Sequence, residues 1–127
     1  MTYTIYIDGG CLHNQTKAKR HAYGSCRIET DSDFKHFFSN IYGNRTNNEA
    51  EYLILIDALV WIKNNIQLTE DIRINTDSQL VVKQLSGEYR IHAHKIYKLY
   101  QKAKELLTSN IGIYQIPRDE IEFKLGH

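Results

Sequence analysis

The chain has 127 residues, 42% of them hydrophobic, and a single proline, which is the size and composition of one compact domain. Its 16 basic and 15 acidic side chains leave a formal net charge of +1, so a nucleic-acid partner would have to bind a local basic patch rather than an overall positive field. There is no candidate membrane span or export signal, and two cysteines are too few for the disulfide framework of a small secreted domain, so we expect a cytoplasmic monomer with reduced thiols and a single domain over residues 1–127.

The first part of the chain predicts three antiparallel strands. Tyr3–Ile7 alternates aromatic and β-branched residues and then meets Asp8-Gly9-Gly10, which indicates a strand followed by a turn. Two further β-like stretches, His21–Glu29 and Phe34–Tyr42, flank the acidic turn at 30–33. A three-stranded meander is the simplest arrangement of these segments.

A buried helix follows the meander. Thr46-Asn47-Asn48-Glu49 matches a capping box, in which the threonine and the glutamate satisfy the first backbone amides of a helix. The run Tyr52–Ile62 that follows is apolar except for Asp57. A helix that is apolar on nearly every side has to be covered, so we expect it to pack against the sheet.

The rest of the chain alternates strands and helices. We expect a strand at Ile72–Thr76, a short helix at Gln79–Leu85, an amphipathic helix at His92–Leu107, a strand at Ile111–Ile116 and a closing helical turn after Pro117. This order predicts an α/β fold, in which a mixed five-stranded sheet has its first three strands antiparallel and its later strands parallel, with helices packed on it.

Two of the predicted strands end in the same way. Asp8 follows the first strand and Asp77 follows the strand at Ile72–Thr76, each with small residues next to it. If these strands are parallel neighbours, both carboxylates emerge at the edge of the sheet where α/β proteins bind ligands. Two adjacent negative charges favour a hard divalent cation between them. The alternative is that each aspartate only begins a turn.

A third carboxylate comes from the start of the buried helix, where Glu49 and Glu51 compete for the role. Glu49 has a structural task, because it occupies the capping-box position. Glu51 has none, and it heads the apolar stripe Leu55, Ala58 and Ile62, where an unpartnered charge would be costly. We therefore favour Glu51 as the third ligand, although periodicity separates the two glutamates only weakly.

Three segments together resemble the catalytic motifs of type 1 ribonucleases H, most closely the compact archaeal and bacterial forms. They are Tyr6-Ile7-Asp8-Gly9-Gly10, Thr46-Asn47-Asn48-Glu49-Ala50-Glu51-Tyr52 and Asn75-Thr76-Asp77-Ser78-Gln79. The resemblance implies the ribonuclease H-like fold, with Asp8, Glu51 and Asp77 as catalytic metal ligands. It also implies hydrolysis of the RNA strand of an RNA–DNA hybrid by two Mg²⁺ ions, with Mn²⁺ as a substitute, leaving 5′-phosphate and 3′-hydroxyl ends.

The fourth acidic ligand of this family is missing. Pro117-Arg118 matches the pair that precedes it, but counting forward from there reaches Lys124-Leu125-Gly126 and then His127. We predict that His127 takes its place as a catalytic metal ligand, and an imidazole ligand would increase the preference for Mn²⁺ over Mg²⁺. The alternatives are a chain end without a role, or Asp119 or Glu120 as the ligand.

The resemblance also implies a set of substrate contacts. An enzyme that cuts only RNA has to sense the 2′-hydroxyl in the minor groove. The backbone of the first motif and the amide side chains of the other two would do this, and the cap threonine would hold a phosphate of the DNA strand. The residues concerned are Gly9, Gly10, Cys11, Thr46, Asn47, Asn48 and Gln79. Without the resemblance we would interpret all of them as structural.

Other sequence features that could indicate nucleic-acid binding are less specific than the three motifs. Lys95, Lys98 and Lys102 lie on one helix face and could follow a phosphate backbone, but a solvated lysine face is the commoner explanation. Larger relatives carry a basic protrusion where this chain has only Leu85–His94, so we expect weaker, strongly salt-dependent binding. Two alternatives stay open. One is a catalytically inactive domain that binds nucleic acid or protein, and the other is an enzyme that also cuts double-stranded RNA.

Overall fold

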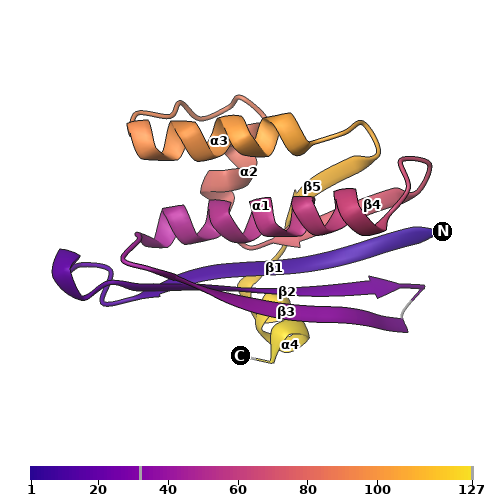
Figure 1. Cartoon of the computed structure of the whole chain (residues 1–127), viewed down its shortest axis with the longest axis horizontal. Coiled ribbons are helices and arrows are strands. Elements are labelled where there is room, and N and C mark those ends of the chain that lie inside the picture. The colour runs from indigo at the N-terminus through magenta and orange to yellow at the C-terminus, as the bar shows by residue number, and fades with distance from the viewer. Residues whose placement is uncertain (32, 127) are drawn as a thin grey trace.

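The computed structural model describes residues 1–31 and 33–126 (Figure 1). The strands are β1 (Thr2–Leu12), β2 (His21–Thr30), β3 (Asp33–Gly43), β4 (Asp71–Thr76) and β5 (Ile111–Gln115). The helices are the single 3₁₀ turn η1 (Lys17–Lys19) and the α-helices α1 (Asn47–Asn65), α2 (Gln79–Leu85), α3 (His94–Leu106) and α4 (Arg118–Leu125).

The five strands form one sheet in the order β3-β2-β1-β4-β5. β1 pairs antiparallel with β2, and β2 pairs antiparallel with β3. β4 is parallel to both of its neighbours, β1 and β5. The predicted mixed five-stranded sheet is therefore confirmed, with the change from antiparallel to parallel pairing at β1.

The first strand is longer than predicted, and the expected turn at Asp8-Gly9-Gly10 is wrong. β1 continues to Leu12 because β2 keeps pairing with it as far as Leu12 and His21. The parallel partner β4 stops earlier, at the pair of Tyr6 and Asn75. Asp8 thus lies inside a strand but beyond the last parallel pair, which leaves its side chain beside the loop that follows β4.

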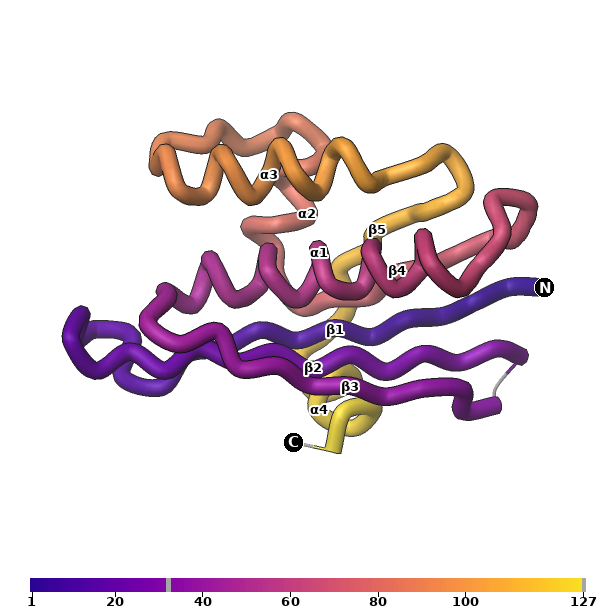
Figure 2. Tube along the Cα trace, in the orientation of Figure 1, coloured from indigo at the N-terminus to yellow at the C-terminus, as the bar shows by residue number. Residues whose placement is uncertain are grey.

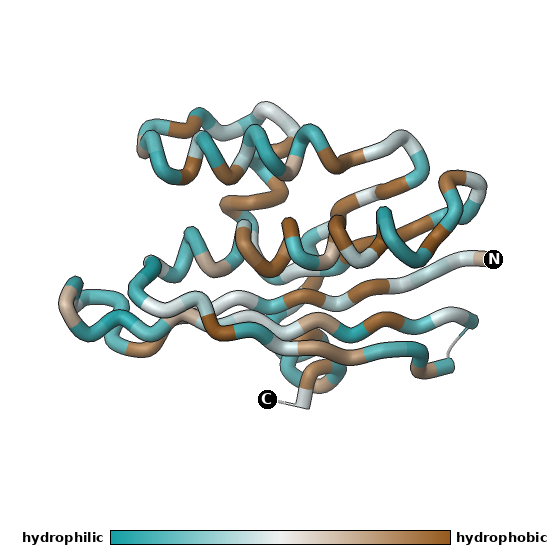
Figure 3. The backbone as a smooth tube through the Cα atoms, viewed as in Figure 1, coloured by the Kyte–Doolittle hydropathy of each residue, from teal (hydrophilic) through white to brown (hydrophobic). Residues whose placement is uncertain are grey.

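Helices cover both faces of the sheet. In Figures 1 and 2, α1 lies along one face with α3 stacked above it, and α4 lies on the opposite face. The core between α1 and the sheet contains the fully buried side chains of Ile5, Leu55 and Ile74. The hydropathy colouring shows brown segments in α1 and in the strands beneath it (Figure 3). The buried helix is confirmed, and α3 explains why its second side is also apolar.

The start of α1 lies directly against β1. A Cβ atom at Gly9 would lie 2.5 Å from the carbonyl carbon of Ala50 and 2.6 Å from the amide nitrogen of Glu51, so only glycine allows this approach. The predicted capping box is present, with Thr46 and Glu49 each bonded to the other's backbone amide. This contact fixes the position of Glu51 relative to Asp8.

Two smaller features complete the fold. α3 begins at His94 rather than His92, and its N-cap, Ala93, makes no side-chain capping bond. Within residues 1–31 and 33–126, none of the helices has the length and apolarity needed to cross a membrane.

Candidate active site

The three carboxylates predicted to be metal ligands line a single pocket. Asp8 comes from β1, Glu51 from the first turns of α1 and Asp77 from the loop between β4 and α2. The pocket has a volume of ≈ 310 Å³. Its lining consists of Asp8, Gly9, Gly10, Cys11, Tyr23, Asn47, Glu51, Asp77 and Arg118. The sequence motifs, which lie far apart in the chain, therefore meet at one edge of the sheet as predicted.

A guanidinium group lies between two of these carboxylates. Arg118 Nη1, at the first residue of α4, donates to Asp8 Oδ1 and to Asp77 Oδ2, both at 2.8 Å. The bond to Asp77, followed by that to Asp8, holds the pKa of Arg118 above its ordinary range, although partial burial opposes this. Arg118 thus offsets part of the negative charge of the three carboxylates.

Glu51 is a partly buried carboxylate with a raised pKa. Its Oε2 accepts a hydrogen bond from Ser78 Oγ, and its Oε1 accepts one from Asn47 Nδ2 at 3.3 Å. Burial, with the charges of Asp77 and Asp8, raises its pKa to about 7, although the Ser78 bond and Arg118 lower it. Glu49 instead closes the capping box and pairs with Arg45, so the geometry favours Glu51 as predicted.

These donors suit a hard divalent cation. All three side chains offer carboxylate oxygens, which are the ligands that Mg²⁺ and Mn²⁺ prefer. Among residues 1–31 and 33–126, however, no three His, Cys, Asp or Glu side chains lie close enough together to hold an ion as they stand. The Arg118 side chain, 51% exposed, occupies the position of a cation between Asp8 and Asp77. An ion between these two carboxylates would therefore compete with Arg118.

The comparison with known proteins identifies the family. The family model described as RNase H matches residues 1–118. The chain belongs to the RNase H family. A curated ribonuclease HI of Halobacterium salinarum is 33% identical over 115 residues, which make up 89% of this chain and 55% of that protein. The chain therefore spans about half the length of this relative.

Solved structures agree with this assignment. The crystal structure of RNase H1 from Halobacterium salinarum matches with a TM-score of 0.86 and 27% identity, covering 99% of this chain and 92% of that one. LC11-RNase H1 in complex with an RNA/DNA hybrid matches with a TM-score of 0.84 and 25% identity, covering 96% and 90%. The predicted ribonuclease H-like fold is confirmed.

The last turn of α4 is joined to the sheet by an ion pair. Lys124 Nζ donates to both carboxylate oxygens of Glu29, at 3.1 and 3.2 Å, and lies 5.1 Å from the centre of the Tyr6 ring. Asp119 and Glu120 line a separate pocket with Tyr6, so the geometry does not favour them as ligands. The predicted ligand His127 lies outside the described residues and stays a prediction.

The predicted substrate residues fall into two groups. Gly9, Gly10, Cys11 and Asn47 line the carboxylate pocket. The other three, Asn48, Gln79 and Thr46, do not line it. Asn48 and Gln79 are exposed near the starts of α1 and α2, and Thr46 serves as the N-cap of α1.

Three further residues of the site were not predicted from the sequence. Arg118 belongs to the Pro117-Arg118 pair, which marked the family pattern without indicating a role. Ser78 follows Asp77 directly, and its hydroxyl both caps α2 and donates to Glu51. Tyr23 lines the pocket from β2, with its hydroxyl against Gly10. Only the pairing of β1 with β2 places it there, so no local signal could have found it.

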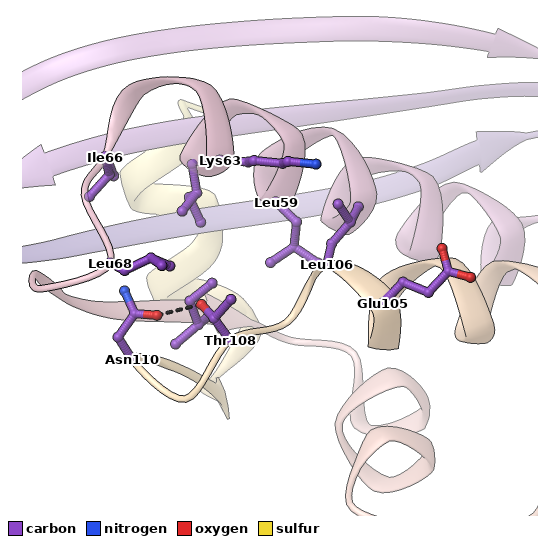
Figure 4. A pocket seen from close by; sticks show the side chains of 10 residues that line it. Leu59, Lys63, Ile66, Leu68, Glu105, Leu106, Thr108 and Asn110 are labelled. Carbon is purple, nitrogen blue, oxygen red and sulfur yellow. Dashed lines mark hydrogen bonds between the residues drawn. The ribbon is translucent and has the colours of Figure 1, made fainter.

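A second, more apolar pocket is lined by one carboxylate rather than three. It has a volume of ≈ 340 Å³ and lies between the last turns of α1 and the segment that joins α3 to β5. In Figure 4, Leu59, Ile66, Leu68 and Leu106 project towards this gap. Its charged side chains, Lys63 and Glu105, have opposite signs, so it lacks the excess of negative charge that distinguishes the carboxylate pocket.

Proposed function

We propose that this chain is an endoribonuclease that hydrolyses the RNA strand of RNA–DNA hybrids by two-metal-ion catalysis, leaving 5′-phosphate and 3′-hydroxyl ends. The observation that carries the proposal is the convergence of Asp8, Glu51 and Asp77 in one pocket of an RNase H fold. The excess of negative charge there supports divalent cations as the cofactors, Mg²⁺ first and Mn²⁺ as a substitute.

In this proposal Asp8, Glu51 and Asp77 hold the ions. Divalent ions bound there would lower the pKa of an attacking water and stabilise the departing 3′ oxygen. Ser78 and Asn47 orient the Glu51 carboxylate through their hydrogen bonds. Arg118 keeps Asp8 and Asp77 partly neutralised until a cation replaces it.

The substrate contacts follow from the pocket lining. Backbone groups of Gly9, Gly10 and Cys11 and the side chain of Asn47 border the carboxylates, where they would face the minor groove of an A-like duplex. Asn48 and Gln79 would extend this contact, and Thr46 would bind a phosphate of the DNA strand. LC11-RNase H1, solved with an RNA/DNA hybrid, has the same fold and supports this choice of substrate. We further propose that the chain acts as a cytoplasmic monomer.

A cleavage assay tests the proposal. Purified protein is incubated with end-labelled RNA–DNA hybrid and Mg²⁺ or Mn²⁺, and we expect Asp8→Asn to lower the rate by about a thousandfold or more, since a metal ion contributes several kcal/mol of transition-state stabilisation. Glu88→Gln, a matched change on an exposed ion pair, should leave the rate unchanged. Cleavage by the Asp8→Asn variant at the wild-type rate, in both metals, would refute the assignment.

Two observations favour a second candidate, an inactive nucleic-acid-binding domain on the same fold. Arg118 already occupies the space between Asp8 and Asp77, and Lys124, in the last turn of α4, pairs with Glu29. Binding of the hybrid without Asp8-dependent cleavage would support this candidate. Competition between hybrid and double-stranded RNA in the same assay decides whether the substrate range is broader.

A further inference from the structure

The connection between β1 and β2 carries positive charge without any acidic side chain. Residues 12–21 contain Lys17, Lys19 and Arg20 and no acidic residue. The chain has 16 basic and 15 acidic side chains, so without these three cations the rest would be slightly negative. Figure 3 shows the connection largely in teal at one end of the molecule. The connection therefore presents positive charge at that end of the molecule.

The two lysines are available to a partner. Lys17 and Lys19 are both exposed on the turn η1. Within residues 1–31 and 33–126, neither ammonium group makes a hydrogen bond or ion pair, whereas Lys83 and Lys124 pair with glutamates. Cations without an internal partner are free to bind an external anion.

The connection is held in a defined conformation. Arg20 Nε donates to the carbonyl oxygen of Asn14 at 2.9 Å, which closes the loop on itself. His13 adopts a left-handed conformation, with φ at 58°, and its carbonyl accepts from the Thr16 amide at 2.9 Å. The lysines therefore extend from a closed turn rather than from an open chain.

The same connection is attached to the active site at two points. Asn14 Oδ1 accepts a hydrogen bond from the Asn47 amide at 2.9 Å, at the start of the helix that carries Glu51. Cys11 Sγ donates to the carbonyl oxygen of Arg45 at 3.1 Å. Cys11 and Asn47 both line the carboxylate pocket. The turn that carries the two lysines is thus tied to the carboxylate pocket.

We propose that the β1–β2 connection is a binding surface for the phosphate backbone of a nucleic-acid duplex, with Lys17 and Lys19 contacting phosphates beyond the active-site pocket. This inference rests on the proposed function for the identity of the duplex, because its surface is continuous with that pocket. The charge and exposure of the lysines suit repeated phosphates, which attract cations without reading sequence.

Salt-dependent binding tests this surface. The Kd of the wild type and of Lys17→Ala/Lys19→Ala is measured by fluorescence anisotropy, with a labelled hybrid of two helical turns and with double-stranded DNA of the same length. The matched control is Lys35→Ala/Lys63→Ala, which removes the same charge near the start of β3 and the end of α1, at the other end of the molecule (Figure 1). Circular dichroism checks that the variants fold.

We expect the Lys17→Ala/Lys19→Ala variant to bind about tenfold more weakly and its slope of log K against log salt to become less steep by about two, since each phosphate contact contributes nearly one unit. The change should be equal for both duplexes, because phosphate contacts do not sense the 2′-hydroxyl. A slope unchanged from wild type, or changed equally in the control, would overturn the proposal even if the hybrid is cleaved. A selective loss of slope in a protein that does not cleave would support this surface while refuting the nuclease.

Discussion

Two clusters of charged side chains, both contacted by α4, differ in their balance of charge. In the carboxylate pocket, three acidic side chains lie near Arg118, which bonds to Asp8 and Asp77. On the neighbouring part of the sheet, the single carboxylate of Glu29 is flanked by Arg27 at 2.7 Å and Lys124 at 3.1 Å. Burial raises the pKa of Glu29, but these two bonds outweigh it and hold the pKa below its ordinary value.

This difference in charge balance distinguishes a candidate cation-binding site from a structural contact. A carboxylate with two cations has no capacity left for a metal ion, and it anchors α4 to the sheet. The carboxylates of the pocket repel one another until a cation arrives, and the charges of Asp77 and Asp8 add to burial, the larger cause, in raising the pKa of Glu51. Buried acids alone therefore do not mark the site, since Glu29 and Asp8 are about equally buried.

The largest expected effect concerns Glu51 and pH. Because the pKa of Glu51 rises from 4.5 to about 7 on folding, the metal-free protein should lose stability as pH rises through this range, by about 2–3 kcal/mol. Glu51→Gln carries no charge and should abolish this loss. Urea unfolding in EDTA at pH 4.5 and pH 8 measures the difference between the two proteins. Parallel pH profiles would show that Glu51 titrates normally.

The second effect belongs to the balanced cluster. Glu29→Gln leaves Arg27 and Lys124 without their partner and should reduce the free energy of unfolding by about 1–2 kcal/mol. Hybrid cleavage should stay within a few-fold of wild type, because Glu29 does not line the carboxylate pocket. Glu88→Gln, on an exposed pair, should leave the free energy of unfolding close to that of the wild type. If Glu29→Gln reduced cleavage as strongly as Asp8→Asn does, the two clusters would not differ in function.

A smaller effect is expected from removing the cation of the acidic cluster. Arg118→Ala should lower the Tm in EDTA, because Asp8 and Asp77 lose their shared donor, and should increase the rise in Tm on adding Mn²⁺. Thermal unfolding over a Mn²⁺ titration measures both changes. Arg45→Ala removes the same charge from a pair outside the pocket and is the control. Equal metal responses in the two variants would mean that Arg118 does not compete with the ion.

The smallest effect concerns the last residue. If His127 is a ligand, the ratio of the cleavage rates with Mn²⁺ and Mg²⁺ should fall by a few-fold in His127→Ala, because imidazole favours the transition metal. Initial rates at saturating metal measure the ratio. Equal wild-type rates with both ions would argue against this ligand.

Much of this protein is determined by local sequence. Alternation and turn residues predicted the five strands, and the capping box at Thr46 predicted the start of α1, because such patterns depend only on neighbours in the chain. The three motifs also predicted Asp8, Glu51 and Asp77, and the structure brings them together. The choice of Glu51 over Glu49 followed from the capping task of Glu49, which the structure confirms.

The tertiary structure decided what depends on partners distant in sequence. The end of β1 at Leu12 depends on pairing with β2, which a local pattern at Asp8-Gly9-Gly10 does not contain. The bonds of Arg118 to Asp8 and Asp77 join positions separated by 110 and 41 residues. Sequence thus supplied the acidic groups, but their shared cation was set by the docking of α4, because a charge pair forms wherever packing brings the partners within reach.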